Sequence, residues 1–243
     1  MNLTIDIGNT RTKLGFFAEK QLIEKIVLEK WNLTDLKAIL NNQNVENIIC
    51  STVKTVNKQM VNYLKQDWYF LNLDSNTSLP IQNLYGTPKT LGKDRLAAVV
   101  GAFDLFPKQN CLVIDAGTCT TYDLLDAQGN YLGGNITPGL NMRYKAMQHF
   151  TAKLPLVDKL EEVKNGIGKN TIEALQVGGG LGNILEMEAW ILYFQDKFKG
   201  INTILTGGDA EYFGKRLKTK IFVNSNLVLI GLNKILNHNA ELL

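Results

Sequence analysis

The chain has few of the residues that build metal centres or disulfide frameworks. Its 243 residues include three cysteines and two histidines. The number of cysteines is odd, and no two of them form a Cys-x-x-Cys pair; they are Cys50, Cys111 and Cys119. We therefore expect neither a disulfide framework nor a zinc site. His149 and His238 have no partner at metal-ligand spacing, and both are better interpreted as surface or hydrogen-bonded side chains than as ligands or bases.

Excess charge and long apolar runs are scarce too. The formal net charge is +3, and no cluster of lysine and arginine is interleaved with aromatic residues, which argues against a nucleic-acid surface. No apolar run approaches the ~20 residues that a membrane helix needs. The first residues also lack a basic segment followed by an apolar core. We therefore expect a cytoplasmic protein that binds neither nucleic acid nor membrane.

What the chain does contain is a repeated acidic turn. Near the N-terminus a β-branched apolar run carries Asp6 close to its end and breaks at Gly8. Residues 112–118 repeat this pattern, and one offset aligns Asp6 with Asp115 and Gly8 with Gly117. A repeat of this length indicates a duplicated domain rather than a solenoid unit. We expect a cleft between the two halves, where small-ligand sites tend to lie.

The residue types of these turns suit a nucleoside triphosphate with its metal ion. Gly8 lets backbone approach a ligand closely, Asn9 and Thr10 supply donors, and Lys13 adds a positive charge. Mg²⁺ uses few carboxylates and keeps several waters, so an isolated Asp serves it better than an acidic cluster. An Asp inside an apolar strand is costly unless it is paired or metal-bound. Two such residues at matching positions favour a functional role.

The order of elements predicts an α/β fold with mixed sheets covered by helices. We expect halves at 1–90 and 91–243, with a helix inside 91–107 near the junction and a loop or linker over 74–90. In the first half, a strand ending near Asp6 is followed by strands at 13–17, 21–28, 45–51 and 68–73 and helices at 32–40 and 55–66. In the second half, strands are expected at 111–116, 121–125, 131–137, 202–205 and 221–223, and helices at 96–106, 142–150, 170–198 with a break at 178–180, and 227–236.

Three further groups have two interpretations each. Asp94 is either a helix cap paired with Arg95 or a general base beside an anion-binding guanidinium, and residue physics alone leaves these about equal. Tyr85 either lines a pocket or packs in a turn. The stretch Thr206-Gly207-Gly208 could let an adenosine lie against backbone, but glycine turns after strands are common.

The motifs taken together resemble type III pantothenate kinases. Thr171 with Ala174 and Gly178, and then Thr206-Gly207-Gly208, continue the similarity, so it covers essentially the whole chain. The motifs that carry it, in the order and approximate spacing of the family, are Asp6-Ile7-Gly8-Asn9-Thr10, Gly92-Lys93-Asp94-Arg95, Asp115-Ala116-Gly117-Thr118 and Gly133-Gly134-Asn135-Ile136-Thr137-Pro138-Gly139.

The resemblance implies a fold, an activity and partners. The fold is a pair of duplicated actin-like, or ribonuclease H-like, domains, each with a mixed five-stranded sheet flanked by helices. The activity is ATP-dependent phosphorylation of pantothenate, the first step of coenzyme A synthesis. Magnesium accompanies the ATP, a monovalent cation (potassium or ammonium) is also needed, and the protein is expected to be a homodimer.

The resemblance also assigns roles to residues. Asp94 is the catalytic proton acceptor with Arg95 beside it, Asp115 is the ligand of the monovalent cation, and Asp6 is a magnesium ligand. The ATP contacts are Asp6, Ile7, Gly8, Asn9, Thr10, Arg11, Thr12, Lys13 and Thr118. The pantothenate contacts are Tyr85, Gly92, Lys93, Asp94, Arg95 and Thr171. Cys119 departs from the alanine that is more usual after Gly-Thr in the family.

Two alternatives use the same scaffold. One is a small sugar or acetate kinase, which would phosphorylate another hydroxyl or a carboxylate. The other is a non-catalytic accessory or regulatory protein, an interpretation that would fit better if Asp6 or Asp94 were missing. Both residues are present.

Overall fold

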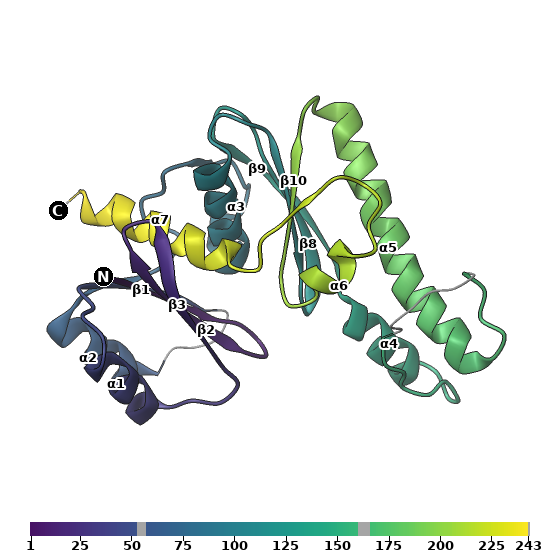
Figure 1. The fold of residues 1–243 in the computed structure, drawn as a ribbon, viewed down its shortest axis with the longest axis horizontal. Coiled ribbons are helices and arrows are strands. Elements are labelled where there is room, and N and C mark those ends of the chain that lie inside the picture. Colours follow the sequence, from purple (N-terminus) through teal and green to yellow (C-terminus); the bar gives the residue numbers. More distant parts are fainter. Residues whose placement is uncertain (53–56, 160–165, 243) are drawn as a thin grey trace. The chain divides into compact units, whose positions relative to one another are not determined.

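The computed structural model describes residues 1–52, 57–159 and 166–242. It contains a five-stranded and a six-stranded sheet (Figure 1). By its internal contacts the chain divides into two compact units that interleave along the sequence. Unit 1 comprises Met1–Lys108, Leu125–Gly133 and Asn226–Leu243, and unit 2 comprises Gln109–Leu124 and Gly134–Ser225.

The five-stranded sheet belongs to unit 1 and has the order β3-β2-β1-β4-β5. Strand β1 pairs antiparallel with β2 and parallel with β4. Leu3 and Ile5 on β1 are fully buried, because their side chains point into the core under the helices of this unit. The strands are β1 (Asn2–Ile7), β2 (Thr12–Ala18), β3 (Gln21–Leu28), β4 (Asn47–Thr52) and β5 (Tyr69–Asn72).

Two helices cover this core, α1 (Leu33–Asn41) and α2 (Lys58–Asp67). The predicted start of α1 is confirmed, because Asn32 and Asp35 form a reciprocal capping box. Helix α2 begins after Asn57, whose side chain accepts from the backbone amide of Gln59. The earlier start predicted for it, at residue 55, lies outside the described residues.

The six-stranded sheet has the order β11-β10-β7-β8-β9-β6. Its run β9-β8-β7-β10-β11 repeats the order β3-β2-β1-β4-β5, and β10 is parallel to both β7 and β11, as β4 is to β1 and β5. The strands are β6 (Gln82–Asn83), β7 (Cys111–Ala116), β8 (Cys119–Leu125), β9 (Asn130–Pro138), β10 (Asn202–Thr206) and β11 (Phe222–Val223). This repeated order is the structural form of the sequence duplication.

Strand β6 corrects the prediction of five strands in each sheet. It comes from the stretch 74–90, which was expected to be a loop, and it pairs parallel with β9. The same stretch ends in a short 3-10 helix, η1 (Pro88–Thr90). A two-residue strand has no periodicity of its own, because its pairing depends on a partner far along the chain.

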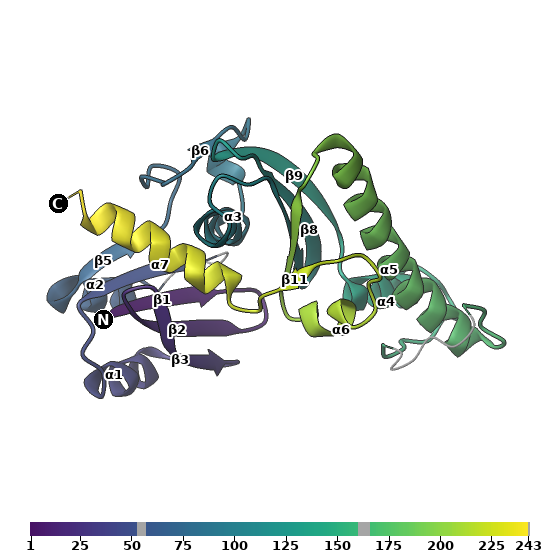
Figure 2. The ribbon, with the colours of Figure 1, turned by 45° about the horizontal axis from the view of Figure 1, so that its top comes forward.

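Helices α3 (Lys93–Leu105) and α7 (Leu227–Ala240) both belong to unit 1 and pack against each other (Figures 1 and 2). Glycine is required at their contact. A Cβ atom on Gly101 would lie 2.4 Å from the carbonyl oxygen of Leu227, and one on Gly231 would lie 1.7 Å from that of Ala97.

The last helix is also tied to the first strand through buried amides. Asn2 Nδ2 on β1 donates to Asn233 Oδ1 at 2.9 Å and to Asn237 Oδ1 at 2.6 Å. The compact units therefore do not follow the predicted halves, since α3 and α7 complete unit 1. The prediction that the duplicated sequence divides into residues 1–90 and 91–243 stays a prediction.

Unit 2 contains the helices α4 (Leu140–His149), α5 (Thr171–Lys197) and α6 (Ala210–Gly214). The predicted break at residues 178–180 is wrong, because α5 is continuous. Gly179 faces α4, and a Cβ atom there would lie 2.2 Å from Cε1 of Tyr144. The glycines allow close helix packing instead of ending the helix. Across the described residues, no helix combines the length and apolar character needed to cross a membrane.

Candidate functional site

Asp6 lies at the end of β1 in unit 1, opposite Lys13 on β2 and Ser51 on β4. Its side chain is partly buried. Burial raises the pKa of the Asp6 carboxyl from 3.8 to about 6; the Lys13 ammonium opposes this shift, and the carboxylate of Asp94 adds to it. A carboxyl group whose pKa is raised by burial and by a second carboxylate marks a candidate functional site.

The turn after Asp6 is closed by its own backbone. The amide of Gly8 donates to the carbonyl oxygen of Arg11 at 3.1 Å, and Asn9 and Thr10 between them are exposed. Arg11 forms a 3.3 Å ion pair with Glu29. The turn therefore presents the polar groups of residues 9 and 10 to the surface.

Thr12, another predicted ATP contact, faces the interior. It is buried, and its hydroxyl accepts a hydrogen bond from Trp31 Nε1 at 2.9 Å. This bond anchors the start of β2 to the segment before α1. Thr12 thus stabilises the turn from its buried side.

The second group of unit 1 is the first turn of α3. Gly92 is the N-cap residue and makes no side-chain cap. Asp94 Oδ1 accepts from the backbone amide of Arg95 at 2.8 Å, and a Cβ atom on Gly92 would lie 2.6 Å from the same oxygen. Glycine therefore leaves room for the carboxylate of Asp94. The carboxylate of Asp94 is also one of the charges that act on the pKa of Asp6.

Arg95 lies on a stack of aromatic rings. Its side chain is buried, and the guanidinium carbon is 5.6 Å from the ring centroid of Tyr85. Tyr85 stacks on Tyr131, with centroids 6.0 Å apart and an interplanar angle of 10°. Gly133, with φ +112°, lets its backbone pass close to the Tyr85 ring. Tyr85 is thus packed between Tyr131 and Arg95, and its role in a pocket stays a prediction.

Asp115 occupies the corresponding position in unit 2, at the end of β7. It lies opposite Thr206 on β10. Gly207 follows with φ +101°, and a Cβ atom there would lie 2.5 Å from Asp115 Oδ1 and 2.3 Å from the carbonyl oxygen of Ala116. Backbone therefore encloses this carboxylate closely.

The turn after Asp115 is also closed by backbone, since the amide of Gly117 donates to the carbonyl oxygen of Cys119 at 3.0 Å. Thr118 at its tip is exposed. The amide of Gly139 donates to the Thr118 carbonyl oxygen at 3.2 Å, and a Cβ atom on Gly139 would lie 2.2 Å from the carbonyl oxygen of Gly117. The motif that ends in Pro138-Gly139 therefore supports the Thr118 turn.

Unit 2 also contains a pocket of about 510 Å³ next to Gly207. Arg216 lies 3.9 Å and Lys159 5.1 Å from the ring centroid of Tyr212, so two cations cover this ring. The pocket is lined by Lys159, Gly207, Gly208, Glu211, Tyr212, Lys215, Arg216 and Ser225. Its lining carries three cations and one carboxylate, and one of the cations, Lys159, also pairs with Asp209 at 3.4 Å. The lining therefore keeps a net positive charge, which suits an anionic ligand such as a nucleotide.

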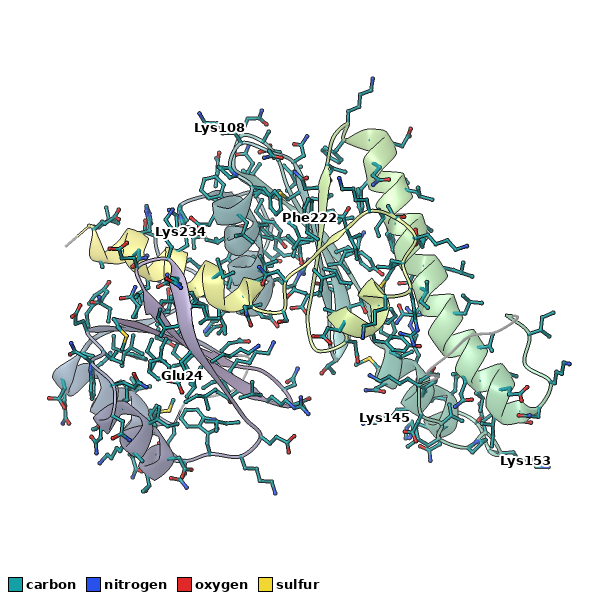
Figure 3. All side chains as sticks on the ribbon, viewed as in Figure 1. Glu24, Lys108, Lys145, Lys153, Phe222 and Lys234 are labelled. Carbon is teal, nitrogen blue, oxygen red and sulfur yellow. The ribbon has the colours of Figure 1, made fainter. Side chains whose placement is uncertain are left out.

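Three side chains of this site region were not predicted as site residues. Tyr131 supports Tyr85, and Arg216 and Lys159 give the pocket its charge. The signal for Arg216 and Lys159 was weak, because lysine and arginine are spread over the whole sequence. Only the fold brings them next to the predicted glycine turn. Figure 3 gives an overview of the side chains, with Phe222 labelled on β11, the strand beside β10.

Thr171, the last predicted pantothenate contact, belongs to unit 2. Thr171 is the exposed first residue of α5 in unit 2, and the side chain of Asn170 caps this helix. Burial raises the pKa of the Cys50 and Cys111 thiols to about 12, as expected for small buried residues. Within the described residues, no group of three or more His, Cys, Asp or Glu side chains forms a metal-binding cluster.

Comparison of the sequence with known proteins gives a family. The model of the family described as type III pantothenate kinase matches residues 2–191. The chain is 45% identical to the type III pantothenate kinase of Bacteroides fragilis (strain YCH46) over 240 residues, covering 98% of both chains. It is 41% identical to that of Flavobacterium johnsoniae over 247 aligned positions, covering 99% of both.

Solved structures with lower sequence identity share the fold. One, described as a Baf family transcriptional activator from Campylobacter jejuni, has a TM-score of 0.62 at 22% identity and covers 98% of this chain and 99% of its own. Another, described as a 2-dehydro-3-deoxygalactonokinase from Sinorhizobium meliloti, has a TM-score of 0.62 at 12% identity with the same coverage. At these identities the similarity concerns the fold alone. With the repeated strand order, it confirms the predicted duplicated actin-like architecture.

Proposed function

The chain belongs to the type III pantothenate kinase family, and on that premise we propose that it transfers a phosphoryl group from ATP to pantothenate, the first step of coenzyme A synthesis. The observation that supports the assignment of roles is that unit 1 contains both Asp6, near the end of β1, and Asp94, in the first turn of α3. Asp6 lies beside the turn closed by the Gly8 amide, and the carboxylate of Asp94 contributes to raising the pKa of Asp6.

Each acidic turn, within its own unit, offers groups that suit the phosphates of ATP. In unit 1, the backbone and side chains of residues 8–11 provide donors, and Lys13 supplies a positive charge. In unit 2, the exposed Thr118 supplies another contact, and the backbone of Gly207 and Gly208, which line the pocket, receives the adenosine. Glycine turns and oriented amides are suited to phosphate oxygens.

The residues fit a magnesium ion at Asp6. A single partly buried carboxylate with a raised pKa gains from a nearby divalent cation, and Mg²⁺ is usually bound by one or two carboxylates and by phosphate oxygens. The ion would neutralise charge on the phosphates. Asp115, enclosed by the backbone of Ala116 and Gly207, is the proposed ligand of the monovalent cation, potassium or ammonium.

Asp94 acts as general base toward the primary hydroxyl of pantothenate. It accepts the hydroxyl proton as the oxygen approaches the transferred phosphoryl group, and such positioned bases contribute about 10²–10⁴-fold in rate. Arg95, held against Tyr85, orients the anionic acceptor or stabilises charge on the phosphoryl group. Tyr85, Gly92, Lys93 and the exposed Thr171 are the proposed acceptor contacts.

We also propose that the protein is a homodimer. Leu185 and Leu192 on α5 are both 58% exposed and lie two turns apart on one face, with Tyr193 beside them at 47%. An apolar helix face of this kind supports association with a second copy. A cytoplasmic location remains a prediction from the sequence.

The test is release of ADP by the purified full-length protein with pantothenate, acetate and a panel of sugars as acceptors, with and without potassium. The proposal expects turnover with pantothenate that depends on magnesium and increases with potassium. Turnover with a sugar or acetate in its place would establish the alternative kinase. Nucleotide binding without turnover on any acceptor would establish the regulatory alternative instead.

A further inference from the structure

An ion pair between helices α4 and α5 lies behind the Thr118 turn in unit 2. Arg143 Nη2 on α4 and Glu186 Oε2 on α5 are 2.5 Å apart, and their side chains are 21% and 27% exposed. The same guanidinium donates through Nε to the carbonyl oxygen of Pro138 at 2.9 Å. Arg143 therefore joins two helices and one backbone carbonyl with a single rigid group.

That carbonyl belongs to the residue before Gly139, which touches the Thr118 turn. The Gly139 amide donates to the Thr118 carbonyl oxygen at 3.2 Å. The space for a Cβ atom on Gly139 is filled by the carbonyl oxygens of Gly117, 2.2 Å away, and Thr118, 2.6 Å away. Because the two backbones are in direct contact, a shift of the Pro138 carbonyl must move residues 117 and 118.

Glu186 is itself held in place. Its second oxygen, Oε1, accepts a hydrogen bond from the hydroxyl of Tyr122 on β8 at 3.4 Å. At this distance the bond is long and weaker than the ion pair with Arg143. The chain of contacts thus runs from Tyr122 and Glu186 through Arg143 to Pro138, and from there to the turn.

We propose that Arg143 and Glu186 are positioning residues that hold the Thr118 turn in the geometry that binds the phosphates of ATP. The proposal rests on the proposed role of Thr118 as an ATP contact. In this proposal neither residue contacts the nucleotide itself. The competing explanation is that the pair only joins α4 to α5 and affects stability without affecting nucleotide affinity.

A charge swap separates the two explanations. Arg143→Met removes both contacts of the guanidinium. The double variant Arg143→Glu with Glu186→Arg restores an ion pair between the helices, but a carboxylate at position 143 cannot donate to the Pro138 carbonyl. The measurements are the Kd for a non-hydrolysable ATP analogue with magnesium, the KM values for ATP and pantothenate, and the Tm.

We expect Arg143→Met to raise the Kd and the KM for ATP about tenfold, below the ~10²-fold that a 1 Å misplacement can cost. The KM for pantothenate should stay unchanged. The swap should recover the Tm while the Kd stays raised. Wild-type Kd in Arg143→Met, or recovery of both Kd and Tm in the swap, would overturn the proposal. If Arg143→Met does not fold, Arg143→Lys, whose single ammonium replaces the fork of donors, carries the same test.

Lys234→Met is the matched control. It removes the ion pair between Lys234 on α7, labelled in Figure 3, and Asp104 on α3, which are 3.5 Å apart with side chains 32% and 15% exposed. This variant should lower the Tm slightly and leave the Kd for the ATP analogue unchanged. Failure of the proposed function would show separately, as wild-type protein that releases no ADP with pantothenate, because the Kd does not depend on the acceptor.

Discussion

The two acidic turns are built alike but have different surroundings. Each follows the central strand of a repeated strand order, and each is closed by a bond from a glycine amide to a backbone carbonyl. Asp6 has Lys13 across the strand pair, whereas Asp115 is enclosed by the backbone around Gly207. The repeated strand order therefore gives Asp6 and Asp115 the same position at the end of a central strand. The residues next to each carboxylate differ, and they determine what it can bind. A lysine beside the carboxylate suits phosphates, and a tight backbone shell suits a small cation.

The largest expected effect is on a residue that neither turn contains. If the turns only bind and Asp94 performs the proton transfer, Asp94→Asn should lower kcat by about 10²–10⁴-fold. The Kd for the ATP analogue should stay near that of the wild type. Steady-state ADP release and calorimetry measure the two quantities.

Asp104→Asn, in the last turns of the same helix, is the control and should keep wild-type turnover. Near-normal kcat in Asp94→Asn would assign the proton transfer elsewhere and return Asp94 to the role of a helix-terminal residue.

The second prediction tests the difference between the turns directly. Asp6→Asn should raise the magnesium concentration at half-maximal rate by about tenfold or more, and Asp115→Asn should do the same for potassium; loss of a residue around a metal site costs about 10–100-fold in affinity. Each variant should leave the other cation requirement close to that of the wild type. Titration of both cations for both variants measures this. Equal changes in the two requirements would mean that the turns share one site.

A third prediction concerns the backbone shell of Asp115. Gly207→Ala should destabilise the protein by about 3 kcal/mol, the upper end of the cost of a strained backbone position, because Gly207 has φ +101° and no room for a Cβ atom. Gly208→Ala next to it meets open space and should change stability by no more than about 0.5 kcal/mol. Urea unfolding of the two variants provides the comparison. Similar stability of the two variants would contradict this prediction and show that the backbone around Asp115 can shift to accept a Cβ atom at low cost.

The smallest effect is the pH dependence of the Asp6 turn without nucleotide. The folded-state pKa of about 6 lies above the ordinary value of 3.8, so the folded protein binds a proton more readily than the unfolded chain does. By linkage, the free energy of unfolding should fall as pH rises from about 4 to about 6. The contribution of Asp6 is on the order of 2 kcal/mol.

Asp6→Asn should remove this part of the pH dependence, which urea titrations of wild type and variant at several pH values would measure. Affinity for the ATP analogue with magnesium should rise through the same pH range as Asp6 ionises. A variant with the same slope as the wild type would show that another group titrates there.

Local chemistry made much of the fold predictable. The capping pair Asn32 and Asp35 marked the start of α1, and the predicted strands Gln21–Leu28 and Cys111–Ala116 are those observed. The acidic turns were visible because the repeat preserves their register. These features depend on neighbours within a few residues, which a sequence displays directly.

What could not be predicted depends on contacts between distant segments. Gly179 signals a helix break by propensity, yet the ring of Tyr144 on another helix makes glycine a packing requirement. The two-residue strand β6 exists only through its pairing with β9. Arg216 and Lys159 become part of a basic pocket because the chain folds them over the ring of Tyr212. None of these partners is indicated by the local sequence.

The return of α7 to unit 1 sets the order in which the nascent protein can be completed on the ribosome. The first strand is synthesised early, but the amide of Asn2 meets Asn233 and Asn237 only after the last helix has emerged. Unit 2 closes at residue 225, before that helix is made. The part of the chain that is translated first is therefore the last to be finished.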